Sequence, residues 1–234
     1  MKNILFTLAL LVCFNSFGQT AEEYLESGRE KSKNEDYYGA IADFTKAIEI
    51  DPDYAYAYAL RGDSKEDLKD YYGAIADYTK AIEIDPDYDY AYNRRGISKD
   101  YLEDYYGAIA DFTKAIEIDP DYDYAYVNRA DTKTEIEDYY GAIADYTKAI
   151  EIDPDYDYAY ALRAFSKRSL KDYYGAIADY TKAIEIDPNY ASAYAFRGVA
   201  KEQLGDLNGA CADWKEAARL GYALAAEWVA DECN

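Results

Sequence analysis

The stretch DYYGAIADFTKAIEIDP, residues 36–52, decides the fold because the chain repeats it almost unchanged. Further copies begin at Asp70, Asp104, Asp138 and Asp172, and a more divergent copy begins at Asp206. Each start lies 34 residues after the one before, and the five prolines keep the same step. A period of this length over most of a 234-residue chain predicts an array of stacked units rather than one globular core.

Each 34-residue unit contains two helical patterns, as the unit 55–88 illustrates. Residues 55–68 have the pattern of one helix, and Asp70 is a favourable N-cap for a second helix over 71–84. Pro86 then stops the second helix because proline lacks an N–H group and clashes with the preceding turn. The pattern predicts an all-α chain of tandem helix-turn-helix units.

Small and aromatic residues recur at fixed places in these units. Ala74, Tyr78 and Ala81 share one face of the second helix by their i, i+4, i+7 spacing, and the two alanines allow the helices to approach closely. Together with Gly62 and Pro86 they form a small-small-aromatic-small-proline set. Counterparts recur in the other units, for example Gly96, Ala108, Phe112, Ala115 and Pro120.

On these residues the chain resembles the tetratricopeptide repeat (TPR) family over about 21–222. The resemblance implies an α-solenoid that forms a right-handed superhelix, with the first helix of each unit lining a concave groove. Arg61 and Lys65 stand where the family most often has Leu and Tyr, so those two columns are less informative. The expected repeats are 21–54, 55–88, 89–122, 123–156, 157–190 and 191–222.

The last unit and the C-terminus follow a different pattern. The last unit has no proline, and Gly221 is expected to end its second helix. Residues 223–234 are expected to form a C-terminal capping helix, in which Leu224 and Trp228 lie one turn apart. A solenoid needs such a cap because its last unit would otherwise expose its packing face.

Two cysteines lie on either side of Gly221. If residues 206–219 and 223–233 pack antiparallel, Cys211 and Cys233 lie at similar distances from the turn. A disulfide between them would stabilise the fold by on the order of 3 kcal/mol. The alternative is a pair of buried free thiols.

The N-terminal residues have the features of a secretory signal. A short positive start precedes an apolar run that is shorter than a membrane span, and small residues follow it. We expect a signal peptide over 1–18 that is cleaved after Gly18, leaving no transmembrane span and an exported protein that is periplasmic or secreted. The alternative is a lipid anchor on Cys13, although the preceding Val12 is bulky for such a site.

The composition restricts the classes of function. A formal net charge of −22 argues against a nucleic-acid partner and favours a basic partner, or simply a well-solvated acidic surface. The chain has no histidine, which excludes histidine-based catalysis and histidine metal sites, and we expect neither cofactor nor metal. The alternating Asp85, Asp87 and Asp89 resemble the start of a calcium loop, but the later places hold Tyr90 and Gly96 instead of Gly and Glu.

Arginine and aspartate form two columns with the same period. Arg61 and its equivalents occupy the first helices, and Asp43 and its equivalents occupy the second helices. The first unit has Ser27 in the arginine column, and it is the one unit that no other unit precedes. We therefore expect ion pairs between units, such as Asp43 with Arg61 and Asp77 with Arg95.

The copies differ mainly along one side of the first helices. Residues that recur in nearly every unit occupy one arc of the helix, and variable residues occupy the opposite arc. One variable column reads Ala59, Asn93, Val127, Ala161 and Ala195. Since the resemblance places this arc in the groove, we expect the partner-binding residues to be Tyr90, Asn93, Arg94, Ile97, Tyr124, Asn128, Asp131, Tyr158, Leu162, Phe165, Phe196 and Val199.

These observations predict a non-enzymatic scaffold that binds a basic or apolar protein or peptide in the groove. Exposed apolar residues in the last two units favour binding, whereas drift on a solvent-exposed face is the alternative. Binding of envelope glycan by the tyrosine columns and self-association of a structural surface protein are the other functions that the sequence leaves open.

Overall fold

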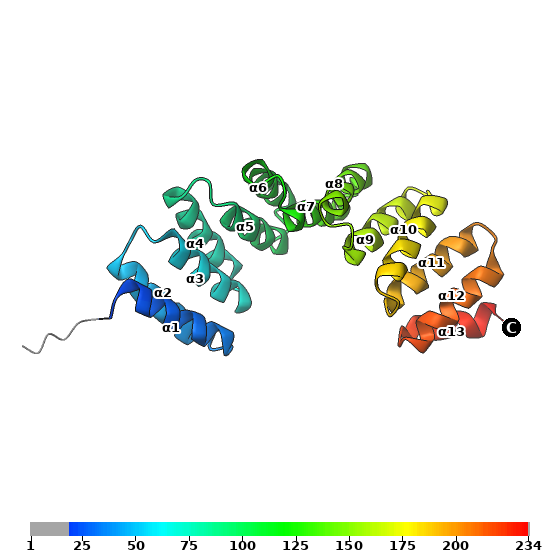
Figure 1. Ribbon diagram of the computed structural model, residues 1–234, viewed down its shortest axis with the longest axis horizontal. Helices are drawn as coiled ribbons and strands as arrows, with labels where there is room; N and C mark the ends of the chain where they lie inside the picture. The colour runs from blue at the N-terminus through cyan, green and yellow to red at the C-terminus, as the bar shows by residue number, and fades with distance from the viewer. Residues whose placement is uncertain (1–18, 234) are drawn as a thin grey trace, which may run out of the picture.

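A computed structural model describes residues 19–233 of the chain, so the expected signal peptide and Cys13 lie outside the described residues. Within 19–233 every regular element is an α-helix, and the helices follow one another around an open arch (Figure 1). The helices are α1 (Ala21–Lys33), α2 (Tyr37–Ile50), α3 (Ala55–Asp67), α4 (Tyr71–Ile84), α5 (Asp89–Tyr101), α6 (Tyr105–Ile118), α7 (Asp123–Glu135), α8 (Tyr139–Ile152), α9 (Asp157–Ser169), α10 (Tyr173–Ile186), α11 (Ala191–Gln203), α12 (Leu207–Arg219) and α13 (Ala223–Glu232).

Each odd-numbered helix from α3 to α11 packs most extensively on the even-numbered helix that follows it, and next on the one that precedes it. Successive odd-numbered helices from α1 to α11 also touch each other directly. Figure 1 shows α6 and α8 on the outer side of the arch, with α7 closer to its hollow side. The prediction of an α-solenoid built from tandem helix-turn-helix units is confirmed. None of the helices within 19–233 is both long enough and apolar enough to cross a bilayer.

A tight turn joins the two helices of each unit. In the third unit the Asp104 carboxylate accepts a hydrogen bond from the Gly107 amide at 3.1 Å, which caps the start of α6. The residue before the cap has a positive φ, 62° at Glu103 and 81° at Gly205 in the last unit. This conformation costs an L-residue on the order of 1 kcal/mol, so the turn is maintained by the cap and by the packing of both helices.

An aromatic side chain from each second helix fills the space between the two helices of its unit. The aromatic residues are Phe44, Tyr78, Phe112, Tyr146, Tyr180 and Trp214, each at most 2% exposed. A Cβ atom on Gly96 would lie only 2.6 Å from the Phe112 ring, so α5 and α6 approach as closely as a small residue permits. The alanines at the repeated positions around these rings are also buried.

The aspartates of the second helices pair with cations of their own unit, so the prediction of pairing between units is wrong. Asp111 Oδ1 lies 2.7 Å from Arg95 Nη2, and Asp111 Oδ2 lies 2.7 Å from Lys99 Nζ. Because α5 and α6 of this unit pack face to face, the Asp111 carboxylate of α6 lies between the two cations of α5. Arg95 still links two units, because its Nη1 donates a hydrogen bond to Thr79 Oγ1 of the preceding unit at 3.1 Å.

The two ends of the array explain why the first unit has Ser27 in the arginine column. In the first unit Ser27 takes the place of the arginine and donates a hydrogen bond to Asp43 at 2.6 Å. The repeat position before Thr45 holds Leu11 instead of a threonine. In the last unit Lys215 occupies the threonine place, where no further unit supplies an arginine. The arginine column is therefore tied to the preceding unit through threonine rather than through aspartate.

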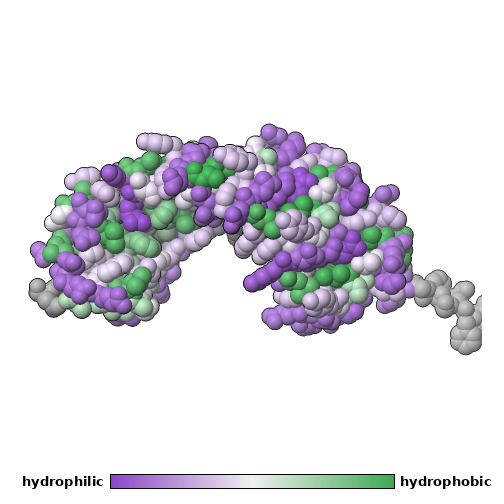
Figure 2. Space-filling view, turned by 180° about the vertical axis from the view of Figure 1, so that it is seen from behind, coloured by the Kyte–Doolittle hydropathy of each residue, from purple (hydrophilic) through white to green (hydrophobic). Residues whose placement is uncertain are grey.

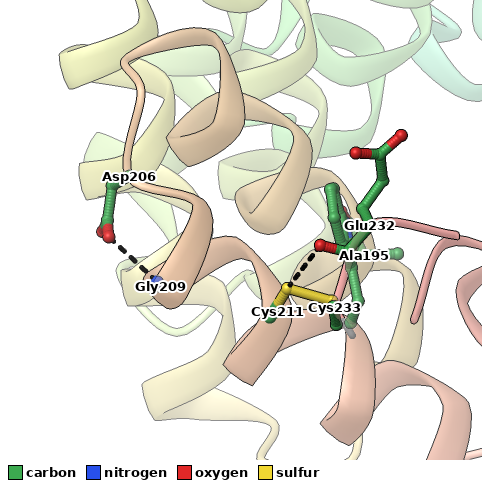
Figure 3. The surroundings of a disulfide bond; sticks show 7 residues. Ala195, Asp206, Gly209, Cys211, Glu232 and Cys233 are labelled. Carbon is green, nitrogen blue, oxygen red and sulfur yellow. Dashed lines mark hydrogen bonds between the residues drawn. A yellow bond between two sulfur atoms is a disulfide. The ribbon is translucent and has the colours of Figure 1, made fainter. Parts of the chain in front are cut away.

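The C-terminal helix covers the end of the stack. Gly221 has a φ of 95° and follows the end of α12, and α13 then packs back on α12. The Trp228 ring lies 5.7 Å from the Trp214 ring, which the last unit would otherwise leave uncovered. A disulfide joins Cys211 of α12 to Cys233 directly after α13, with a Cα–Cα distance of 5.6 Å (Figure 3).

Substitution of Asp111 by Ala should lower the free energy of unfolding by about 3 kcal/mol, because it leaves the partly buried Arg95 and Lys99 without their counter-charge. Glu117→Ala is the matched control, since Glu117 forms an exposed ion pair with Lys114 and such pairs contribute about 0–1 kcal/mol. Urea denaturation followed by circular dichroism measures both variants. Equal midpoints for the two variants would contradict the role of the buried aspartates.

Candidate functional site

One of the variable columns of the first helices is not open to a partner. Ala59, Asn93, Val127, Ala161 and Ala195 are at most 9% exposed. The Asn93 amide donates to the Tyr122 hydroxyl at 3.2 Å and accepts from Asn128 at 2.9 Å. The prediction that Asn93 contacts a partner is therefore wrong, because the next unit covers this side of the helix.

In units 2 and 3 the inner face is occupied by a closed polar network. Arg94 lies 3.1 Å from both Asp63 and Glu66. The hydroxyls of Tyr78 and Tyr90 donate to Asp63 at 2.7 and 2.8 Å. Tyr90 and Arg94, both expected to contact a partner, thus already have partners within the chain.

In units 4 and 5, two repeat periods later, the positions equivalent to this network carry a different set of residues. Asp131 is the equivalent of Asp63, Tyr146 of Tyr78, and Tyr158 of Tyr90, but Leu162 replaces Arg94. Asp131 accepts a hydrogen bond from the Tyr146 hydroxyl. No ion pair to Asp131 is found within residues 19–233, so its carboxylate lacks the cation that its equivalent has.

Burial raises the pKa of Asp131 from the ordinary value of 3.8 to about 6. The neighbouring carboxylates of Asp100 and Glu135 raise the pKa further, while the hydrogen bond from Tyr146 lowers it. At neutral pH the side chain is therefore a carboxylate held in an unfavourable environment. This carboxylate borders a cavity of about 330 Å³ that Glu135, Tyr158, Leu162 and Phe165 also line.

A second, apolar cavity of about 210 Å³ adjoins this acidic one. It brings together four of the residues that the sequence placed in the groove, namely Tyr158, Leu162, Phe165 and Phe196. Its other lining residues are Ala161, Tyr180, Tyr190, Ser192 and Ala193. Tyr158, Leu162 and Phe165 line both cavities, so the acidic and the apolar cavity lie side by side.

Arg168 is a functional candidate that the sequence reasoning missed. Its guanidinium carbon lies 5.2 Å from the centre of the Phe165 ring and 5.3 Å from that of Phe196. The sequence does single out this position, because Arg168 is basic whereas the equivalent positions in four other units are acidic or neutral. These positions hold Glu66, Asp100, Thr134 and Glu202. The charge at the inner face thus changes sign between Asp131 and Arg168.

The other predicted groove residues lie apart from the apolar cavity. Ile97 and Asn128 line a third cavity of about 210 Å³, which Asp131 also borders from its other side. The Tyr124 ring is exposed and meets the Tyr156 ring edge-on at 5.9 Å. Val199 packs on the C-terminal core cluster instead.

The alternating aspartates between units have a structural role. Asp85 accepts a hydrogen bond from the backbone amide of Asp87 at 3.2 Å, which stabilises the turn after α4. Over the described part of the chain, no group of three or more Asp, Glu or Cys side chains is arranged to hold a metal ion.

Comparison with protein families identifies the class of protein. Family models described as "Tetratricopeptide repeat" match residues 21–54, 55–88, 90–122 and 123–156, and one described as "TPR repeat" matches 166–205. The chain belongs to the tetratricopeptide repeat family. No curated protein sequence matched it.

Solved structures of other proteins share the fold. A structure of MamA is 27% identical, with 70% of this chain and 96% of that chain covered and a TM-score of 0.66. YrrB, titled a TPR protein with an unusual peptide-binding site, is 22% identical, with coverages of 79% and 96% and a TM-score of 0.67. PilF of Pseudomonas aeruginosa is 17% identical, with coverages of 86% and 91% and a TM-score of 0.74.

Substitution of Asp131 by Asn should stabilise the protein at pH 7. Between pH 3.8 and about 6 the folded state binds more protons at this carboxyl than the unfolded state, so the wild type loses stability as the pH rises through this window. The full loss amounts to about 3 kcal/mol. Asn cannot ionise and still accepts the Tyr146 hydrogen bond, so it escapes this loss.

Thermal unfolding at pH 4 and pH 7 measures the effect. The variant's advantage should be largest at pH 7 and should shrink toward pH 4. Asp111→Asn is the control, because Asp111 is paired with two cations and its neutralisation should destabilise the fold. A lower unfolding midpoint for Asp131→Asn at pH 7 would show that the carboxylate is stabilised rather than strained.

Proposed function

We propose that the chain is a non-enzymatic scaffold that binds another protein or a peptide along the inner side of the arch. The observation that carries the proposal is the apolar cavity in units 5 and 6, where Leu162, Phe165 and Phe196 meet. The six aromatic side chains that fill the space between the paired helices are at most 2% exposed. Here the side chains stay partly exposed and surround open space, which is typical of an interaction site.

The surface charge supports a partner that is basic or apolar. Hydrophilic residues are spread over both arms of the arch, and its underside is hollowed (Figure 2). With a net charge of −22, the protein attracts positively charged ligands at long range, and the apolar cavity then supplies burial at short range.

The chemistry of the inner face gives no support to catalysis. The aspartates of the second helices are buried between an arginine and a lysine, which is the arrangement of structural ion pairs. The chain contains no histidine. A scaffold requires neither a nucleophile nor a general base, which agrees with this inventory.

We further propose that the protein acts outside the cytoplasm, after removal of residues 1–18. The Cys211–Cys233 disulfide supports this proposal because disulfides persist in oxidising compartments. Intact mass of the protein purified from its source tests both points. It should lack residues 1–18 and should gain no mass on alkylation without reduction.

Glycan binding is the second candidate function. The observation that favours it is a row of tyrosines at the second position of successive second helices, each at least 76% exposed. The row consists of Tyr38, Tyr72, Tyr106, Tyr140 and Tyr174. Exposed aromatic rings can stack on sugars, so retention on cell-wall polysaccharide that is lost when these tyrosines are replaced would favour this function over the first.

Crosslinking capture tests the groove directly. The variant Leu162→Ala/Phe165→Ala/Phe196→Ala should fail to recover a partner that the wild type recovers from an extract of the source organism, because it loses the apolar walls of the cavity. Tyr106→Ala/Tyr140→Ala/Tyr174→Ala is the matched control, since it removes three aromatic rings from an exposed row instead. Helical circular dichroism verifies that both variants fold. Equal recovery of every partner by wild type and the first variant would refute the groove assignment.

A further inference from the structure

We propose that the ligand of the cavity between units 4 and 6 is a peptide with one basic and one apolar side chain, the basic group pairing with Asp131 and the apolar side chain lying against Leu162, Phe165 and Phe196. The inference rests on the function proposed above and specifies the chemistry of the partner.

The chain itself shows which group fits the carboxylate. In units 2 and 3, Asp63 holds the Arg94 guanidinium at 3.1 Å, with the hydroxyls of Tyr78 and Tyr90 on the same carboxylate. In units 4 and 5 the tyrosine equivalents, Tyr146 and Tyr158, are both present, whereas Leu162 replaces the arginine and Thr134 replaces Glu66, the arginine's second carboxylate partner. A guanidinium or ammonium group from a partner would restore the arrangement that the earlier units complete internally.

The surroundings of Asp131 favour a cation over any other group. The charged residues that face it are Asp100 from α5 and Glu135 from α7, and both are acidic. The titratable groups from α8 and from the start of α9 are tyrosines, which are neutral at pH 7. A bound cation would offset the cost of burying this carboxylate.

The apolar side chain follows from the second cavity. Tyr158, Leu162 and Phe165 line both cavities, so a cation at Asp131 and a group in the apolar cavity are close enough to belong to one ligand. A volume of about 210 Å³ is below the usual size of a pocket for a drug-sized molecule and suits a single side chain.

Arg168 gives the site a direction. Its guanidinium lies over the rings of Phe165 and Phe196, so two walls of the apolar cavity have a positive charge beside them. A second basic residue of the ligand would be repelled there. The basic group is therefore expected at Asp131, and the apolar side chain against the Phe165 and Phe196 rings.

Binding of defined peptides tests the proposal. The probes are fluorescein-labelled, end-capped Gly/Ser octapeptides with one Arg and one Phe separated by one, two or three residues. At least one of them should bind the wild type at pH 7.5 and low salt. Replacement of its Arg by citrulline, which is neutral and of the same shape, should weaken binding at least about tenfold. Replacement of Phe by Ala should also weaken it.

Asp131→Asn should weaken binding of the Arg peptide at least about tenfold and should leave binding of the citrulline peptide unchanged. Asp63→Asn is the matched control, because Asp63 already has Arg94 as its partner. It should leave the affinity unchanged. Helical circular dichroism verifies that each variant is folded, so that lost binding is not a loss of fold.

The variant Leu162→Arg copies the internal pair of units 2 and 3 into units 4 and 5. Its own guanidinium should occupy Asp131 and abolish binding of the Arg peptide. Leu162→Met, which keeps an apolar wall of similar volume, should retain binding. Affinity for the wild type should also fall about tenfold from pH 7 to pH 5, since Asp131 takes up a proton with a pKa of about 6.

Two results would overturn the proposal. One is that none of the Arg/Phe peptides binds the wild type. The other is that neither the citrulline replacement nor Asp131→Asn changes the affinity. If the alanine variant at Leu162, Phe165 and Phe196 loses its captured partner while Asp131→Asn keeps it, the charge assignment fails and the scaffold function stands. If the alanine variant keeps every partner, the scaffold function itself fails.

Discussion

The arch depends on the contacts of an arginine that is shared by two neighbouring units. Its guanidinium pairs with an aspartate of its own unit and donates to a threonine of the preceding unit, as Arg129 does with Asp145 at 2.7 Å and Thr113 at 3.0 Å. Because both contacts are directional and partly buried, they fix the rotation of each unit relative to the last. Apolar packing of the repeated alanines and aromatic rings supplies the burial, but it is less directional.

Because the register is fixed, each position of the repeat has a defined place on the inner face of the arch. Equivalent positions in successive units fall at equivalent places along the arch, so a substitution in one copy changes one site and leaves the packing intact. Asp63 with Arg94 closes the face in units 2 and 3, whereas Asp131 with Leu162 leaves a carboxylate at a cavity that adjoins the apolar one. The same fold thus carries a completed polar cluster in one place and an open site in another.

The sequence predicted the fold closely and the contacts less well. The period and the Asp and Pro signals placed the second helix of unit 55–88 at 71–84, where α4 lies. A period of 34 shows which columns meet, but it cannot tell whether two residues meet within a unit or across units, and this is why the aspartates were paired wrongly. The burial of Asn93 depends on the next unit, and one helix considered alone does not show it.

A double-mutant cycle between Thr113 and Arg129 measures whether the shared arginine holds neighbouring units in register. The two residues lie in neighbouring units and are joined by the hydrogen bond at 3.0 Å. Unfolding free energies of Thr113→Val, Arg129→Met and the double variant give their coupling. If the arginine holds the register, the coupling should be favourable by about 1 kcal/mol or more. A coupling within error of zero would show that the units keep their register without the shared arginine.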